Sequence, residues 1–115
     1  MRGDQAYLAH ILECLRRIEE DVGGGREQFF ASHTIQDAVI RNLQTLAEST
    51  KRLSDGVKAS RPEVEWSNIA GLRNILVHAY FDVDLEIVWG IVQSDLPKLK
   101  QAVAEILDSG LSTGD

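Results

Sequence analysis

The segment RNILVHAY, residues 73 to 80, places four polar or semi-polar side chains in an otherwise aliphatic stretch. On a helix with about 3.6 residues per turn, Asn74 and His78 lie one turn apart and Arg73 lies on the adjacent stripe. Histidine can exchange a proton near neutral pH, and the planar guanidinium of arginine binds phosphate. Asparagine can orient the imidazole or donate to a phosphate oxygen. These residue types therefore suit acid–base chemistry at a phosphate.

Cleavage of RNA without a metal ion is the reaction that this set suits best, with the 2′-hydroxyl attacking the adjacent phosphorus. That reaction needs a base, an acid and stabilisation of charge at the phosphorus. The sequence has no cluster of ligands at metal-site spacing, so we expect no metal and no other cofactor. One histidine cannot be base and acid in the same step, whereas a two-fold dimer supplies two. The alternative, a salt-linked surface or a satisfied interface, is the commoner role of an arginine and a histidine on a helix.

Helical periodicity dominates the chain, and no segment alternates as a strand would. A first helix is indicated by an apolar stripe at three- and four-residue steps: Tyr7, Leu8, Ile11, Leu12, Leu15, Ile18 and Val22. Gly23, Gly24 and Gly25 end it. No strand precedes these glycines and no Lys-Ser/Thr pair follows them, so they predict a turn rather than a phosphate-binding loop.

A second long helix is predicted after a short turn around Phe29 and Phe30. Thr34, with Asp37 three residues later, has the form of a capping box at its start. Its apolar face is formed by Ile35, Val39, Leu43, Leu46 and Leu53. Residues 54–62 lose this periodicity, which predicts a loop.

The third helix, from Glu63 or Trp66 to Tyr80, carries the polar motif. One side holds the aliphatic residues Ile69, Leu72, Ile75, Leu76 and Ala79. On the other side Arg73, Asn74 and His78 interleave with Ala70 and Val77. A face of small apolar residues around an arginine and a histidine is typical of a surface that meets another protein chain.

The last third of the sequence predicts two more helical segments. Asp82 or Asp84 can cap the first, which carries Leu85, Val88, Trp89 and Val92. Pro97 fits the first turn of the second, with Ser94 or Asp95 before it, and a break between the helices is expected near Pro97. Its apolar face comprises Leu99, Val103, Ile106 and Leu107, and residues 109–115 are expected to form a frayed tail. The connections are short, which predicts an all-α antiparallel bundle of four to five helices, one domain spanning residues 1–115.

Composition limits the classes of function. The chain has 115 residues, a hydrophobic fraction of 43% and a formal net charge of -6. A net negative charge disfavours general binding to nucleic acid, so binding to RNA must rest on a few local cations. The single cysteine, the lack of a signal-peptide pattern and the lack of a long apolar run predict a cytoplasmic protein that does not enter a membrane.

The run from Pro62 to Trp89, PEVEWSNIAGLRNILVHAYFDVDLEIVW, resembles the signature region of the HepT-like toxins of the HEPN superfamily. That family's motif is Arg, four residues, His, any residue, Tyr, and Arg73, His78 and Tyr80 match it. The polar residue that often follows the arginine is matched by Asn74. The flanking pattern agrees at Pro62, Trp66, Gly71, Leu72, Phe81, Trp89, Leu96 and Pro97. Residues 35–49, IQDAVIRNLQTLAES, resemble the family's second long helix.

The resemblance implies an all-helical, two-fold homodimer that acts as the toxin of a type VII toxin–antitoxin system. It implies a metal-independent endoribonuclease in which Arg73 and His78 meet at the dimer cleft, with Asn74 as an orienting group. The cognate antitoxin would be a minimal nucleotidyltransferase (MNT) that attaches AMP to Tyr80. Binding-only relatives exist within HEPN, so a helical module that docks a nucleotidyltransferase and presents a substrate to it is the alternative.

A polar stripe on the second long helix has two interpretations. Asp37, Arg41, Gln44 and Glu48 follow helical spacing and can form a solvated face with an Asp37–Arg41 pair. Alternatively, part of the stripe flanks the cleft. The similar acidic position in the family favours Glu48 as a supporting residue, with Asp37 as a second candidate.

The remaining candidates for chemistry have ordinary expected roles. His10 lies beside the apolar stripe of the first helix, and His33 lies at a helix entrance. Neither has the paired spacing that a zinc site needs. Cys14 is expected to pack as a small hydrophobic residue.

Overall fold

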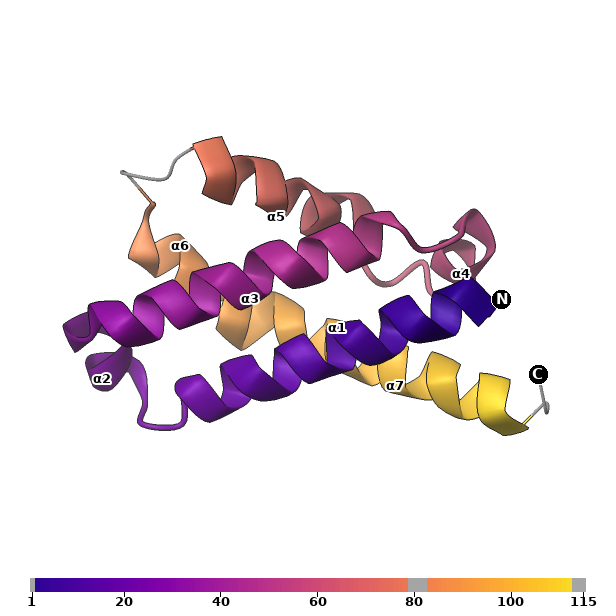
Figure 1. The fold of residues 1–115 in the computed structure, drawn as a ribbon, viewed down its shortest axis with the longest axis horizontal. Coiled ribbons are helices and arrows are strands. Elements are labelled where there is room, and N and C mark those ends of the chain that lie inside the picture. The colour runs from indigo at the N-terminus through magenta and orange to yellow at the C-terminus, as the bar shows by residue number, and fades with distance from the viewer. Residues whose placement is uncertain (1, 79–82, 113–115) are drawn as a thin grey trace.

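The computed structural model describes the backbone of residues 2–78 and 83–112 and the side chains of residues 3–72 and 83–109. Throughout these residues the regular structure is helical, with no strand. Long helices run lengthwise through a body of 45 × 27 × 21 Å (Figure 1). The all-α bundle predicted from the periodicity is therefore confirmed. None of the described helices is long and apolar enough to cross a membrane.

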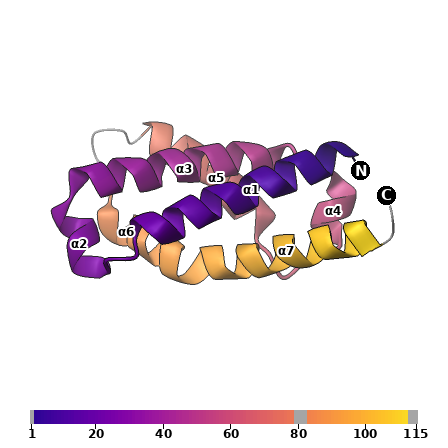
Figure 2. The same cartoon turned by 60° about the horizontal axis from the view of Figure 1, so that its bottom comes forward.

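The helices pack in a defined order. Along the chain they are α1 (Arg2–Asp21), α2 (Arg26–Ala31), α3 (His33–Lys51), α4 (Asp55–Ala59), α5 (Trp66–His78), α6 (Leu85–Gly90), the π-helical segment η1 (Ile91–Asp95) and α7 (Leu96–Ser112). Helix α3 packs between α1 and α5, and α7 packs on α1 (Figures 1 and 2). Helix α5 runs back along α3, which is its main neighbour, and so forms an edge of the bundle.

The predicted apolar stripes form the core. Buried side chains of the three longest helices include Leu8, Ile11, Leu15 and Ile18 of α1, Val39, Leu43 and Leu46 of α3, and Leu99 and Val103 of α7. Their spacing of three and four residues directs them to one side of each helix. The predicted positions of α1, α3 and α7 are thus confirmed by burial.

The turn expected around Phe29 and Phe30 is instead the short helix α2, and this prediction was wrong. The side chain of Phe29 is fully buried, with its ring centroid 5.2 Å from Phe30 and 5.3 Å from Trp89. These aromatic contacts stabilise a helix too short to form alone. Gly25, which precedes α2, has a φ of 92°, a left-handed conformation that favours glycine.

The start of α3 also differs from the prediction. Ser32, in extended conformation, caps the helix by accepting a hydrogen bond from the Ile35 amide at 3.2 Å. The capping box at Thr34 and Asp37 is therefore not formed. The side-chain Nε2 of Gln36 donates to the backbone carbonyl oxygens of Phe29 and Phe30, which ties the end of α2 to the start of α3.

The predicted loop at residues 54–62 contains the helix α4. Ser54 caps it, with its hydroxyl accepting from the Val57 amide at 3.3 Å. The buried carboxylate of Asp4 in turn accepts from the backbone amide and the hydroxyl of Ser54, each at 2.8 Å. This contact from the N-terminal helix holds the start of α4, and its long sequence separation explains why local periodicity missed it.

The break expected before Pro97 is absent. Helix α6 is capped by Asp84, one of the two caps that the sequence offered, and continues through η1 into α7 with helical backbone angles at Gly90, Ile91 and Leu96. Proline has no backbone N–H to continue the helical hydrogen bonds. The π-helical turn η1 changes the hydrogen-bond register just before Pro97, so the proline is tolerated in the first turn of α7. Helix α7 then extends to Ser112, beyond the expected start of the tail.

Replacing Phe29 by alanine is expected to lower the free energy of unfolding by about 3–5 kcal/mol, because it empties a fully buried aromatic site. Urea denaturation followed by circular dichroism measures this change. The matched control is Ile87→Ala, at a side chain that is 60% exposed, where we expect a change within about 0.5 kcal/mol. Equal urea midpoints for the two variants would contradict the stabilising role of the buried Phe29 ring.

Candidate functional site

The structure places the predicted catalytic residues on one helix. Helix α5 runs without interruption from Trp66 to His78, so Arg73, Asn74 and His78 are all part of it. The side chains of these three residues, and Tyr80 as a whole, lie outside the described residues. The predicted convergence of their functional groups therefore stays a prediction.

Helix α5 buries one side and leaves another open. Trp66, Ile69 and Leu72 are buried, and the Trp66 indole N–H donates to the Arg61 carbonyl at 3.0 Å. On a different side, a Cβ added at Gly71 would meet no atom of the described residues within 4 Å outside the helix's own backbone. Helical spacing of four, three and four residues aligns positions 67, 71, 74 and 78 on this open side. The side of α5 that carries two motif positions is thus uncovered at Gly71 in the single chain.

The supporting residues suggested by the sequence lie on the neighbouring helix. Since α3 and α5 run in opposite directions, Asp37 lies toward the His78 end of α5 and Glu48 toward its Trp66 end (Figure 1). Glu48 is half-buried and pairs with Arg52 at 3.2 Å. Asp37 is exposed, and within the described ion pairs it does not form the expected pair with Arg41. The supporting roles of Glu48 and Asp37 stay predictions.

A second group of polar side chains lies in a groove between α1 and α3. It encloses about 230 Å³ and is lined by His10, Glu13, Cys14, Arg17, Arg41, Asn42 and Thr45. His10 joins the two helices, with its Nδ1 2.7 Å from the hydroxyl of the buried Ser49. Sequence reasoning treated His10 as ordinary. The sequence feature that points to this groove is the helical spacing of His10, Cys14 and Arg17, which places them on one side of α1.

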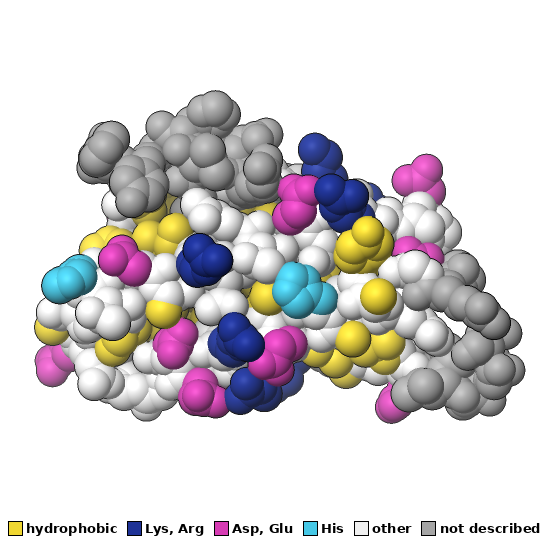
Figure 3. Space-filling view, in the orientation of Figure 1, with side chains coloured by type: hydrophobic (Ala, Val, Ile, Leu, Met, Phe, Trp, Pro, Cys, Tyr) yellow, Lys and Arg dark blue, Asp and Glu magenta, His cyan; other side chains and the backbone are white. Residues whose placement is uncertain are grey.

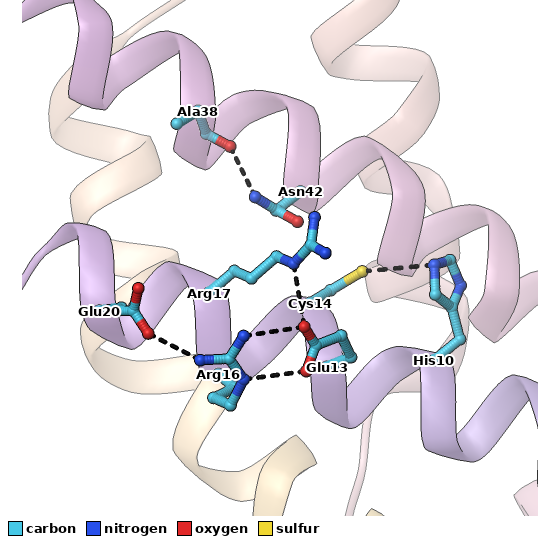
Figure 4. Close-up of polar contacts among 8 residues, drawn as sticks. All are labelled: His10, Glu13, Cys14, Arg16, Arg17, Glu20, Ala38 and Asn42. Carbon is cyan, nitrogen blue, oxygen red and sulfur yellow. Dashed lines mark hydrogen bonds and ion pairs between the residues drawn. The ribbon is translucent and has the colours of Figure 1, made fainter.

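An ion-pair network of exposed side chains on α1 includes Glu13 and Arg17, which line this groove (Figure 4). The Glu13 carboxylate accepts hydrogen bonds from Arg16 at 2.9 Å and from the Nε of Arg17 at 3.0 Å, while Arg16 also donates to Glu20 at 2.7 Å. These hydrogen bonds, first from Arg16 and then from Arg17, lower the pKa of Glu13 to about 2. Glu13 therefore remains a carboxylate throughout the neutral range and holds both arginines.

Cys14 behaves as the sequence predicted. Its side chain is 3% exposed, and its sulfur lies 3.9 Å from the Nε2 of His10. Burial raises the pKa of the thiol, which keeps it protonated and a poor nucleophile. In the described part of the chain, no group of three or more histidine, cysteine or acidic residues is arranged to hold a metal ion.

Comparison with known proteins identifies a family that this chain matches. The family model described as Ribonuclease HepT-like matches residues 11–106, which include α5 and most of the bundle. A probable ribonuclease HepT of Thermococcus cleftensis is 37% identical over 100 residues, covering 86% of this chain and 91% of that protein. An mRNA nuclease HepT of Shewanella oneidensis is 30% identical, covering 84% of this chain and 90% of that protein. No solved structure matches the chain.

One similar protein is longer. A protein of Methanocaldococcus jannaschii named "Gamma-glutamylcyclotransferase and putative RNase" is 39% identical over 110 residues. The match covers 94% of this chain and 50% of that protein, so the chain spans half of its length. The helical fold and the family match agree with each other. The chain belongs to the Ribonuclease HepT-like family, within the HEPN superfamily.

Proposed function

We propose that this protein is a metal-independent endoribonuclease and the toxin of a type VII toxin–antitoxin pair. The observation that carries the proposal is the family match together with an intact Arg73, His78 and Tyr80 motif. The placement of Arg73 and His78 on an edge helix supports it, since an edge helix can meet both RNA and a second chain.

The proposed reaction is an attack of the RNA 2′-oxygen on the adjacent phosphorus. One His78 accepts the proton of the 2′-hydroxyl, and His78 of a second copy protonates the departing 5′-oxygen. Arg73 stabilises the charge that develops at the phosphorus, and Asn74 orients the imidazole. The products are a 2′,3′-cyclic phosphate and a 5′-hydroxyl. Single-stranded RNA fits this chemistry, because its flexible backbone can reach the in-line geometry.

A two-fold dimer through α5 supplies the second histidine. Helix α5 packs chiefly on α3, and no atom of the described residues outside its own backbone lies near a Cβ at Gly71, which supports the close approach of another helix there. In a two-fold interface, the same side of α5 would meet its own copy, so the motif positions of both chains would share one cleft.

Replacing Val77 by glutamate is expected to break the dimer and to abolish cleavage while helicity persists. Val77 shares the motif side of α5 by sequence spacing, so the change would place like charges opposite each other across the two-fold axis. Analytical ultracentrifugation and RNA cleavage measure the two effects. Ile87→Glu, which adds the same charge at an exposed position of α6, is the control that should remain dimeric. A folded monomer of Val77→Glu that still cleaves RNA would contradict the composite site.

We further propose that a nucleotidyltransferase antitoxin silences the toxin by AMPylation of Tyr80. The phenolic oxygen would attack the α-phosphorus of ATP and release pyrophosphate, in a reaction whose magnesium is held by the partner. The added phosphodiester and nucleoside would occupy the place where Arg73 receives the RNA phosphate. Inhibition would then be both electrostatic and steric.

The alternative is a binding module that docks a nucleotidyltransferase without cleaving RNA itself. Purified, partner-free protein treated with EDTA and incubated with single-stranded RNA separates the two functions. Cleavage with 2′,3′-cyclic phosphate ends supports the nuclease. Intact RNA, together with formation of a complex with the nucleotidyltransferase, supports the binding module.

A further inference from the structure

The groove between α1 and α3 gathers positive side chains that the proposed reaction does not use. Arg17 enters it from α1 and Arg41 from α3, with His10 and Asn42 beside them. Figure 3 shows arginine, histidine and acidic side chains together on the face that α1 and α3 form. In a chain with a formal net charge of -6, such local cations decide where an anion can bind.

The two arginines present donors toward the groove. The Nε of Arg17 is its only guanidinium nitrogen that donates to Glu13. Figure 4 shows the end of the Arg17 guanidinium pointing toward Asn42. Arg41 is exposed, and among the described residues its guanidinium has no ion-pair partner. Both side chains therefore keep N–H groups available for a ligand.

Ion pairs on α1 position Arg17 beside the groove. Glu13 is bound by Arg16 and Arg17 together, and Arg16 is also bound by Glu20. Across the groove, Asn42 donates to the Ala38 carbonyl at 3.0 Å, which leaves its side-chain oxygen fixed and its second N–H available. His10 is held by Ser49 at 2.7 Å. A planar guanidinium fixed by one nitrogen is prepared to bind a phosphate with the others.

We propose that the α1–α3 groove binds a backbone phosphate of the RNA strand, away from the bond that is cut. The inference rests on the proposed ribonuclease function and adds a substrate-binding subsite to it. Helix α3 forms one wall of the groove and on its other side packs against α5. A helix is about 10 Å across, so a few nucleotides passing over α3 connect the groove with the motif helix.

The test measures RNA affinity in protein that cannot cut. In a His78→Ala background, binding of a fluorescent single-stranded RNA is followed by anisotropy over a series of salt concentrations. Arg41→Gln should weaken binding about three- to tenfold and reduce the slope of log affinity against log salt by about 0.7. The control is Lys58→Gln, which removes the same charge on α4, outside the groove, and should leave affinity unchanged.

Substrate length gives a second readout in protein that retains His78. A dinucleotide cannot reach from α5 across α3, so Arg41→Gln should impair cleavage of a long RNA more than cleavage of a dinucleotide.

Equal effects of Arg41→Gln and Lys58→Gln on RNA affinity would overturn the subsite, even if the wild type cleaves RNA. Weaker binding of ATP or inorganic pyrophosphate with unchanged RNA affinity would also overturn it, in favour of a free-phosphate ligand. If wild-type protein neither binds nor cleaves RNA, the proposed function itself fails.

Discussion

Replacing His78 by alanine is expected to lower the rate of RNA cleavage by about 10²- to 10⁴-fold, because it removes the group that transfers protons in both halves of the reaction. Helix α5 should remain intact, since His78 is its last residue and alanine favours helix. Single-turnover cleavage of a labelled RNA by EDTA-treated protein measures the effect.

The matched control for this experiment is His33→Ala. His33 is exposed at the first position of α3, and its loss should leave cleavage unchanged. Equal cleavage by wild type and His78→Ala would show that a contaminating nuclease produces the signal, and the assignment of His78 would fail.

Replacing Tyr80 by phenylalanine is expected to prevent AMPylation completely and to leave the toxin active when its nucleotidyltransferase partner is present. Phenylalanine keeps the aromatic ring but lacks the oxygen that attacks the α-phosphorus of ATP. Intact-mass spectrometry of protein co-expressed with the partner measures the modification, and growth of the host cells measures the toxicity. Wild type should gain whole AMP units and become harmless, whereas Tyr80→Phe should do neither.

The sequence offers a matched control, because Tyr7 is the other of its two tyrosines. Tyr7 is half-buried on α1, and Tyr7→Phe should be modified and silenced like the wild type. Wild-type protein that is neutralised without any gain in mass would show that the partner inhibits by binding alone.

The long helices could be predicted from sequence because each buries a regular stripe. Positions such as Leu8, Ile11 and Leu15 identify their own helix through spacing, whatever the rest of the chain does. The short helices could not be predicted in this way. Helix α2 depends on contacts of Phe29 with Trp89, 60 residues further along the chain, and α4 depends on Asp4 reaching Ser54. Tertiary contacts, rather than local periodicity, select these elements.

The candidate site could be predicted in part for the same reason. The motif is local, so the spacing of Arg73, Asn74 and His78 predicted a shared helix, which α5 confirms. The α1–α3 groove is not local, because His10 and Ser49 meet across 39 residues of sequence. The sequence places Arg41 in a polar stripe that either faces solvent or flanks the cleft, and nothing in the sequence shows that α1 lies beside it.

The most direct test of the composite site is the activity of a mixed dimer containing one wild-type and one His78→Ala chain, isolated through two different affinity tags. If one cleft needs a histidine from each copy, as proposed, the mixed dimer should cleave RNA nearly as slowly as the His78→Ala homodimer. Two independent sites would instead give half of the wild-type rate. A mixed dimer with half of the wild-type activity would contradict the shared cleft and with it the proposed mechanism.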